Sequence, residues 1–295
     1  MSYLDEVQQD IARIAEQVGP AIAGIGGRRR AVGSGVIAGD GRIVTNAHNL
    51  RGSEVHLTVG DTESDGAVAG RDVDGDIAVV SADTAGTAPA EWGSVEDITI
   101  GTPVFALSNP GGRGLRVTVG FVSGTERSFR GPRGRRIAGS IEHTAPLLPG
   151  SSGGALVDRD GRLIGINTNR LGEGFYLAIP ADEQLRSKVD SLARGEAPVR
   201  PRLGIGIAPP HVAKGLRRAV GLPDADGLLI RAVEEGGPAD TAGLQEGDLI
   251  VAASGAPVGS VDDFYDVLEK AADGRTFELT LLRGTDERTV SVALS

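Results

Sequence analysis

The sequence predicts a protein built mainly of β-strands, followed by a smaller C-terminal module of mixed strands and helices. Many short runs rich in Val, Ile and Thr alternate with Gly and Asp, and the chain contains 45 glycines but only 3% aromatic residues. Abundant glycine favours tight turns between short strands. Many short strands with few helices are typical of a barrel or a sandwich. A chain of 295 residues is long enough for two or three cores.

The first predicted element is an amphipathic helix over residues 2–18. Ser2 is a helix-capping residue type, and Asp5 occupies the capping-box position three residues later. Apolar residues recur on one face of this helix at Leu4, Val7, Ile11, Ile14 and Val18. This face needs a partner surface, so we expect residues 1–20 to form a helical segment that packs on the first domain.

Short strands follow after Pro20. Residues 35–38 and 43–45 flank Asp40 and Gly41, which is a sequence typical of a hairpin turn. In residues 55–59, apolar and polar side chains alternate with the period of a half-buried strand. Further apolar runs of strand length lie at residues 77–80, 104–107, 117–122, 155–157 and 163–166.

The residue pattern changes from short strands to a helix and a polar segment after Pro180, which marks the end of the first domain. A helix-prone stretch covers residues 181–192, and the polar, proline-bearing segment 194–201 follows it. We expect the first domain over residues 21–192, a linker over 193–200 and a second domain over 201–295. The second domain shows strand patterns at 203–207, 227–233, 277–282 and 289–294 and two helices, one opening at Pro238 and one capped by Ser260.

Ser152 is the candidate nucleophile, because it lies in the glycine-rich turn PGSSGG at residues 149–154 between two apolar runs. Acyl transfer from an amide places negative charge on the carbonyl oxygen, and two backbone N–H groups aimed at that oxygen lower the barrier. Gly150 and Ser152 have the spacing to supply these groups as an oxyanion hole. Ser151 fits less well, since only Ser152 directly precedes the two glycines.

A serine hydroxyl needs a base, and His48 is the best placed of the four histidines. It follows a strand pattern at 43–47, whereas His56, His143 and His211 occupy less suitable positions. Asp76 is the candidate third member, in preference to Asp72 and Asp74. It directly precedes the apolar run 77–80, so it should enter the barrel wall partly buried. The resulting order His, Asp, Ser is the order of chymotrypsin-type enzymes.

At this point the chain resembles the HtrA/Deg family of serine proteases. The shared motifs are GSGVI at 33–37, TNAH at 45–48, DIAV at 76–79, SNP at 108–110, the serine loop and GINT at 165–168. The resemblance implies an all-β double barrel of the chymotrypsin/trypsin-like class, with the active site between two six-stranded barrels, followed by an α+β PDZ domain. It also implies a trypsin-like serine protease domain over 21–192, assembly as a homotrimer or multiples of one, and protein quality control by cutting unfolded or damaged polypeptides.

The chain departs from the family pattern at four places. Asn49 stands where Val usually follows the histidine, Ser151 where Asn usually precedes the serine, Ala155 where Pro is usual, and His143-Thr144 where Thr-Asp is usual. These departures leave the triad intact but concern the substrate pocket, whose walls we expect at Leu147, Asn167 and Thr168. They also keep two alternatives open, a catalytically inactive protease-fold chaperone and a PDZ scaffold that binds peptides.

The second domain carries a specific signature. The segment GPADTAGLQEGDLI at 237–250 is similar to the signature of bacterial PDZ domains. By the same resemblance, Arg202, Leu203, Gly204 and Ile205 form the carboxylate-binding loop, where successive N–H groups hold the C-terminus of a bound peptide. The expected partners are therefore unfolded polypeptides and peptide C-termini.

Composition excludes several other functions. The absence of cysteine excludes thiol catalysis and thiolate metal sites, and the scattered acidic residues have no metal-ligand spacing, so we expect no metal and no cofactor. A net charge of −10 argues against binding of nucleic acid. Two local groups of arginines are exceptions to this negative charge. No aromatic residues interleave with them for base stacking, so we expect them to lie in solvated loops. The groups are residues 28–30 and Arg127, Arg130, Arg133, Arg135 and Arg136.

The sequence shows no secretory signal and no apolar stretch near the 20 residues that span a bilayer. We therefore expect no membrane span, and a cytoplasmic location if the chain is complete. If a leader was removed, the cell envelope or periplasm is expected instead.

Overall fold

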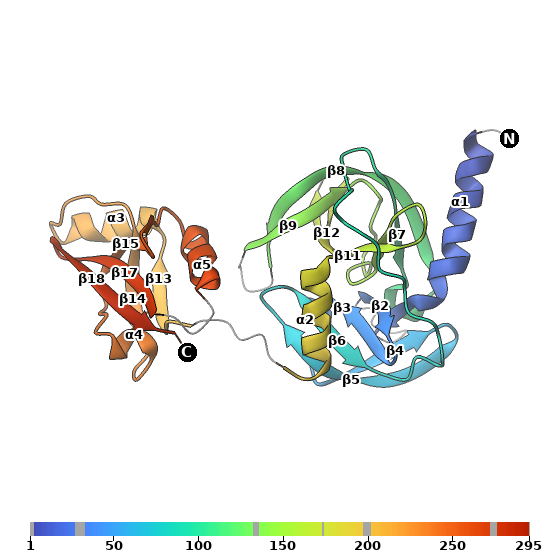
Figure 1. Ribbon diagram of the computed structural model, residues 1–295, viewed down its shortest axis with the longest axis horizontal. Coiled ribbons are helices and arrows are strands. Elements are labelled where there is room, and N and C mark those ends of the chain that lie inside the picture. Colours follow the sequence, from blue (N-terminus) through green and yellow to red (C-terminus); the bar gives the residue numbers. More distant parts are fainter. Residues whose placement is uncertain are drawn as a thin grey trace. The chain divides into compact units, whose positions relative to one another are not determined.

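A computed structural model describes residues 3–26, 33–131, 136–172, 174–196, 202–271 and 276–294 of the chain (Figure 1). The chain divides into two compact units, Met1–Pro198 and Val199–Ser295. Of the expected linker over 193–200, residues 197–200 lie outside the described residues, as do Ser2 and the arginines at 28–30, Arg133 and Arg135.

The first half of unit one is a closed barrel with strand order β1-β2-β3-β6-β5-β4. Its strands are β1 (Ile22–Ile25), β2 (Gly33–Gly39), β3 (Arg42–Thr45), β4 (Glu54–Val59), β5 (Thr62–Asp72) and β6 (Ile77–Ser81). The hairpin expected at Asp40 and Gly41 joins β2 to β3, and Gly41 adopts a φ of +61° in that turn. The strand β6 is buried from Ile77 to Val80, which matches its continuous apolar sequence.

The second half of unit one is another closed barrel, with strand order β10-β11-β12-β9-β8-β7. Its strands are β7 (Pro103–Ser108), β8 (Arg116–Arg130), β9 (Arg136–His143), β10 (Ala155–Val157), β11 (Leu163–Gly172) and β12 (Phe175–Pro180). Within the described residues each barrel therefore has six strands, and the fold class is confirmed (Figure 1). Buried residues of both barrels join in one hydrophobic cluster.

Two helices complete unit one. The helix α1 (Tyr3–Val18) buries Ile14 and Val18 in the core, and it lies against β7 and β8 of the second barrel. The guanidinium of Arg13 donates to the Arg159 carbonyl at 2.7 Å, which fixes the polar side of the same contact. The helix α2 (Glu183–Ala193) begins at Asp182, whose carboxylate accepts from the Leu185 N–H, and packs on β5 and β6. The partner surface expected for the N-terminal helix is thus the second barrel.

Unit two is a sheet with strand order β13-β14-β15-β17-β18. Its strands are β13 (Ile205–Ala208), β14 (Leu228–Val233), β15 (Leu249–Ala253), the short β16 (Ala256–Pro257), which pairs with β15, β17 (Thr276–Arg283) and β18 (Asp286–Ala293). The helices α4 (Pro238–Thr241) and α5 (Val261–Lys270) begin where the sequence predicts them. A separate core around Phe264 and Phe277 holds the unit together.

A third helix of unit two, α3 (Pro210–Ala219), was not expected from the sequence. Its polarity is reversed relative to the usual pattern, because Arg217 is 2% exposed while Val212 and Leu216 face the solvent. The buried Arg217 guanidinium donates to the carbonyls of Pro223 and Gly284, so it joins α3 to two loops. The sequence does carry helix signals here, since Pro210 stands at the start and Val212, Leu216 and Val220 recur four residues apart.

Candidate active site

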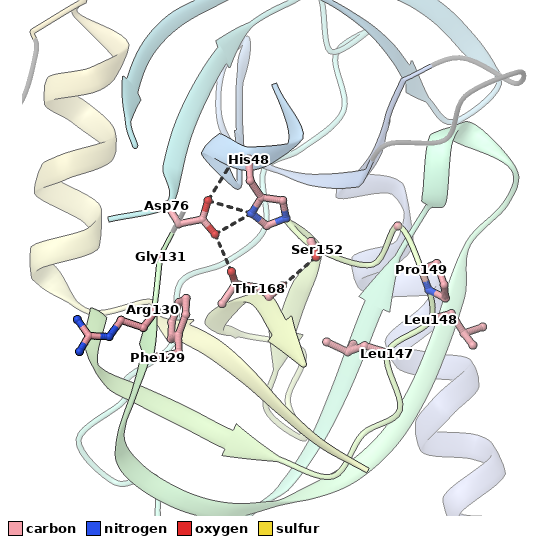
Figure 2. Close-up of a pocket in the computed structure, with 11 residues that line it drawn as sticks. His48, Asp76, Phe129, Arg130, Gly131, Leu147, Leu148, Pro149, Ser152 and Thr168 are labelled. Carbon is pink, nitrogen blue, oxygen red and sulfur yellow. Dashed lines mark hydrogen bonds and ion pairs between the residues drawn. The ribbon is translucent and has the colours of Figure 1, made fainter. Parts of the chain in front are cut away.

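The first barrel brings His48 and Asp76 together through strand pairing. β3 and β6 are antiparallel with Thr45 opposite Ala78, so the residues that follow β3 lie beside the residues that precede β6. His48 sits on the short 3-10 helix η2 (Ala47–Asn49) directly after β3. Its Nδ1 lies 2.8 Å from Oδ2 and 2.9 Å from Oδ1 of Asp76 (Figure 2).

This contact fixes the tautomer of the imidazole. A carboxylate oxygen accepts hydrogen bonds, so Nδ1 of His48 is the donor in this contact, and in the neutral imidazole Nε2 then carries the lone pair. Oδ1 of Asp76 also accepts from the His48 backbone N–H at 3.1 Å. The His48 side chain is 39% exposed, so its Nε2 edge can meet a ligand.

Asp76 is 1% exposed and is held from both barrels. Besides His48, the Thr168 hydroxyl donates to Oδ2 at 2.8 Å, so the buried carboxylate has several hydrogen-bond donors. Its backbone has a φ of +53°, a conformation that costs free energy for a residue other than glycine. The Asn46 side chain donates to the Asp76 carbonyl at 3.0 Å and helps hold that conformation.

Ser152 lies on the loop between β9 and β10 of the second barrel. Its hydroxyl donates to the Thr168 carbonyl at 2.9 Å. Among the described residues it makes no hydrogen bond to His48, although both side chains line one cavity of about 430 Å³ (Figure 2). The serine side chain can move between staggered rotamers about its Cα–Cβ bond without a change in the main chain.

The main chain before Ser152 forms a type II turn. The Ser151 N–H donates to the Leu148 carbonyl at 3.0 Å, with Pro149 and Gly150 at the two central positions and a φ of +86° at Gly150. In the part of the chain that the structure describes, the N–H groups of Gly150 and Ser152 have no protein acceptor. Both groups are therefore available to an oxygen atom bound beside Ser152.

The expected pocket residues have different roles in the structure. Leu147 and Thr168 line the cavity, with Leu148 and Pro149 beside Leu147 and with Phe129 on the other side (Figure 2). Asn167 does not line it. Its fully buried side chain donates to the Ala155 carbonyl at 2.7 Å and accepts from His143. It therefore supports the end of the serine loop from the interior of the barrel and is not part of the cavity wall.

His143 is a buried neutral histidine. Burial lowers the pKa of His143 from 6.5 to about 4, and the hydrogen bond to Asn167 opposes this shift only in part. Its ring stacks on Tyr176 with centroids 5.9 Å apart, and its Nε2 lies 3.1 Å from Asn167 Oδ1. Its Nδ1 has no partner among the described residues. The residue therefore fills the barrel interior as an uncharged ring.

Four contacts of the site, made by three residues, were not expected from the sequence. Thr168 was assigned to the pocket wall alone, yet its hydroxyl holds Asp76 and its carbonyl holds Ser152. Ser34 and Asn49 both reach the main chain of the serine loop, with Ser34 Oγ on the Gly150 carbonyl and Asn49 Nδ2 on the Ser152 carbonyl, each at 2.9 Å. The partners of Ser34 and Asn49 lie more than 100 positions away, so a local pattern does not indicate these two contacts.

The loop expected to bind a carboxylate leads into an open sheet edge in unit two. Leu203 is buried, Gly204 has a φ of +70°, and the carbonyls of Leu203 and Gly204 accept from the N–H groups of Ala239 and Glu234. Ile205 begins β13, and within the described residues β13 has β14 as its single hydrogen-bonded neighbour. Its other edge can accept an added strand.

The described residues include no group of three or more His, Asp or Glu side chains arranged to hold a metal ion. They also include no helix with the length and apolar character needed to cross a membrane. Of the arginine clusters, Arg127 pairs with Glu142 at 3.3 Å.

Comparison with protein families gives two matches. Residues 33–166 match the trypsin-like peptidase domain, and residues 201–294 match the PDZ domain. Among curated proteins, the putative serine protease HhoA of Synechocystis is 34% identical over 283 residues, covering 90% of this chain and 71% of that protein. The serine endoprotease DegS of Escherichia coli is 31% identical over 284 residues, covering 90% of this chain and 77% of that protein.

A third relative is longer than this chain. The chloroplastic Protease Do-like 1 of Arabidopsis thaliana is 34% identical over 275 residues, and the match covers 86% of this chain but 61% of that protein. Among solved structures, the serine endoprotease from Yersinia pestis has a TM-score of 0.73 at 28% identity, with 97% of each chain covered. An HtrA-type protease, AlgW with a decapeptide, has a TM-score of 0.76 at 24% identity, covering 97% of this chain and 98% of that one, and this likeness concerns the fold.

Proposed function

The chain belongs to the HtrA/Deg family of serine proteases, and on that premise we propose that it is a serine endopeptidase that hydrolyses unfolded or damaged polypeptides in protein quality control. One observation carries the proposal. The Nδ1 of His48 is bonded to the buried carboxylate of Asp76, and His48 lines the same cavity as Ser152, an arrangement in which the imidazole can take the serine proton once the hydroxyl turns toward it.

In the proposed reaction, the Ser152 hydroxyl first turns from the Thr168 carbonyl toward His48. His48 Nε2 takes the hydroxyl proton while Oγ attacks the peptide carbonyl carbon, and the N–H groups of Gly150 and Ser152 bind the resulting oxyanion. The imidazolium then gives its proton to the leaving amine, and a water molecule hydrolyses the acyl-enzyme by the reverse sequence of proton transfers. Asp76 orients the imidazole and stabilises its charged form.

The walls of the cavity favour an apolar substrate side chain. Leu147, Leu148 and Phe129 contribute apolar surface, and the cavity volume of about 430 Å³ accommodates a single aliphatic side chain together with backbone. Apolar side chains become accessible when a polypeptide unfolds, which supports the choice of unfolded or damaged polypeptides as substrates.

A peptide C-terminus is the proposed ligand of unit two. Its carboxylate would meet the backbone at Arg202, Leu203, Gly204 and Ile205, and its last residues would add a strand to the open edge of β13. The PDZ match over residues 201–294 supports this role.

The endopeptidase proposal is tested by incubating the purified chain with casein beside a Ser152→Ala variant. We expect fragments from the wild-type chain and none above background from the variant, because the variant lacks the attacking oxygen. Equal fragment release from the two proteins would contradict the proposal. Mass spectrometry of the fragments reports the residue on the acyl side of each cut, which tests the preference for apolar side chains.

The direction of the Ser152 hydroxyl favours a second candidate, a protein that holds polypeptides without cutting them. The hydroxyl is bonded to Thr168 and not to His48, as in a resting site. A fluorophosphonate probe separates the two candidates, because stable labelling at Ser152 requires an activated hydroxyl. Absence of labelling together with suppression of aggregation of a denatured client would support the second candidate.

Assembly and location complete the proposal. The family resemblance supports a homotrimer, which light scattering after size-exclusion chromatography measures directly. Among the relatives, the protein from Halomonas elongata is named a probable periplasmic serine endoprotease DegP-like, which favours the cell envelope over the cytoplasm. Fractionation of cells that express the native gene tests this, and recovery in the cytoplasmic fraction would contradict it.

A further inference from the structure

The serine loop and the proposed base come from different barrels. Ser152 belongs to the second barrel, while His48 and Asp76 belong to the first. The distance between nucleophile and base therefore depends on how the serine loop is attached to the first barrel. Two buried side chains of the first barrel, Ser34 and Asn49, make that attachment through the main chain of the loop.

Ser34 holds both residues of the expected oxyanion hole. Its backbone N–H donates to the Ser152 carbonyl at 2.9 Å, and its hydroxyl donates to the Gly150 carbonyl at 2.9 Å. The same hydroxyl accepts from the Asn109 N–H at 3.0 Å, so its rotamer is fixed. The side chain is fully buried.

Asn49 adds a second donor to the Ser152 carbonyl. Its Nδ2 donates to that carbonyl at 2.9 Å and to Thr45 Oγ1 at 3.0 Å. The Thr45 hydroxyl in turn donates to the Ser34 carbonyl at 2.7 Å, which closes a ring of hydrogen bonds through Ser34 and back to Ser152. Asn49 is 4% exposed and directly follows His48 in the chain.

These contacts fix the peptide planes on either side of the Ser152 N–H. The Gly150 carbonyl belongs to the peptide before Ser151 and the Ser152 carbonyl to the peptide after Ser152, so the intervening peptide, which carries the Ser152 N–H, is held at both ends. The serine loop also packs closely against Ser34 and Thr45, which belong to the ring of hydrogen bonds. A Cβ atom on Gly153 would come within 2.1 Å of the Ser34 carbonyl oxygen and 2.4 Å of Thr45 Oγ1.

We propose that Ser34 and Asn49 are positioning residues that hold the two peptides flanking the one that carries the Ser152 N–H, so that this N–H stays in place for an oxyanion when the Ser152 side chain turns toward His48. This inference rests on the proposed endopeptidase function. Asn49 is also one of the departures of this chain from its family, where the resemblance gives Val. Valine fills the space but donates no hydrogen bond.

The test compares Asn49→Val, Asn49→Asp and Ser34→Ala with the wild-type full chain. The aspartate keeps the size of Asn49 but presents oxygen to the Ser152 carbonyl. We expect kcat per titrated active site to fall about tenfold for Asn49→Val and Ser34→Ala, and further for Asn49→Asp, with KM changed less than about twofold. A double variant of Ser34 and Asn49 should lose less than the product of the two single effects, because the two side chains hold the peptides on either side of the same Ser152 N–H.

Ser108→Ala is the matched control. Ser108 is also buried and its hydroxyl lies 3.1 Å from Ser151 Oγ, so it contacts the serine loop without touching a carbonyl of Gly150 or Ser152. We expect it to keep kcat within about twofold of the wild-type value. Titration with a fluorophosphonate separates misplacement from unfolding. A misfolded variant titrates only in part, with normal turnover per site, whereas a mispositioned one titrates fully and turns over slowly.

Wild-type turnover per site in Asn49→Val and Ser34→Ala would overturn the inference, and so would an equal loss in Ser108→Ala. If the wild-type chain itself neither cuts casein nor reacts with the probe, the endopeptidase proposal fails. Amide hydrogen exchange then still tests the attachment. We expect faster exchange at the bonded N–H groups of Ser151, Gly153 and Gly154 in both variants than in the wild-type chain, and unchanged exchange would overturn the inference.

Discussion

At the residue scale, the contact between Thr168 and Asp76 connects the two barrels at the carboxylate itself. The Thr168 hydroxyl donates to Oδ2 at 2.8 Å, and Asp76 is 1% exposed. A hydrogen bond to a charged group contributes about 1.5–3 kcal/mol. The candidate triad is therefore a group of four residues, and sequence order revealed three of them.

A Thr168→Val substitution tests this contact with a side chain of the same shape. We expect kcat to fall by about tenfold or more, because the imidazole loses a rigid acceptor when its carboxylate is free to turn. KM should change little, since valine still lines the cavity. Steady-state kinetics on a peptide substrate measures both constants, and an unchanged kcat would show that His48 alone keeps Asp76 in place.

His143 makes a pH prediction at the same scale. Because burial lowers the pKa of His143 from 6.5 to about 4, the unfolded chain binds a proton at a higher pH than the folded chain. The neutral His143 ring therefore makes its full contribution to the free energy of unfolding above pH 6.5, and this contribution is lost as pH falls toward 4. The loss amounts to about 3 kcal/mol over that window.

Urea unfolding of the wild-type chain and of His143→Gln at pH 7.5, 6, 5 and 4.5 measures this contribution. Glutamine keeps a donor for Asn167 but does not titrate in this range. We expect the free energy of unfolding to fall more steeply with acid in the wild-type chain, and the two curves to converge at low pH. Parallel curves would mean that His143 has the same pKa in the folded and the unfolded chain.

At the scale of elements, the N-terminal helix is part of the protease unit and not an appendage. Ile14 is fully buried in the same hydrophobic cluster as the barrel strands, and Val18 lies beside it. Its amphipathic pattern in the sequence predicted a partner surface, and the helix lies against β7 and β8. Helices of this kind gain most of their stability from such packing.

An Ile14→Ala substitution should lower the free energy of unfolding of the protease unit by about 2–5 kcal/mol, because it leaves a cavity in a closely packed core. Ile11→Ala is the matched control, since Ile11 packs against the same cluster but is only half-buried, and we expect a smaller loss. Thermal unfolding of both variants gives the comparison. Equal losses would show that α1 is not anchored through Ile14.

The loop before β13 decides peptide binding in unit two. Gly204 has a φ of +70°, and a Cβ atom there would lie 3.0 Å from Glu234 Oε2, so a Gly204→Ala change should strain the loop. We expect affinity for a peptide with a free C-terminus to fall at least about tenfold, measured by fluorescence anisotropy, and amidation of the peptide to have a similar effect.

Gly284→Ala provides the control for backbone strain. Gly284 has a φ of +65° with open space around it, and it lies in the turn between β17 and β18. Alanine at position 284 would have the same unfavourable positive φ as alanine at 204. Because position 284 lies outside the loop at 202–205, we expect peptide affinity to stay near the wild-type value. An equal loss of affinity in both variants would argue for general destabilisation and against carboxylate capture by this loop.

At the scale of the whole molecule, the candidate active site is assembled from segments far apart in the chain. His48 follows β3, Asp76 precedes β6, Ser152 precedes β10 and Thr168 lies on β11. The closure of two barrels brings these positions to one cavity, so each barrel contributes part of the site. Association of functional loops with rigid strands is a common way to fix such groups.

The sequence by itself determined the fold class, the order of the strands along the chain and the family, because these depend on local signals: alternation of apolar residues, glycine at tight turns and motifs in a fixed order. The fold class and the family are confirmed. The triad, the oxyanion groups and the peptide-binding loop stay predictions that the geometry supports.

Only the tertiary structure decided which atoms meet. The sequence did not indicate that Ser152 Oγ faces Thr168, that Asn167 supports the cavity from behind, or that Ser34 and Asn49 hold the loop of the other barrel. The bonds of Ser34 and Asn49 join residues more than 100 positions apart in two barrels, so they depend on how the barrels pack, and that packing leaves no periodic trace in a single sequence.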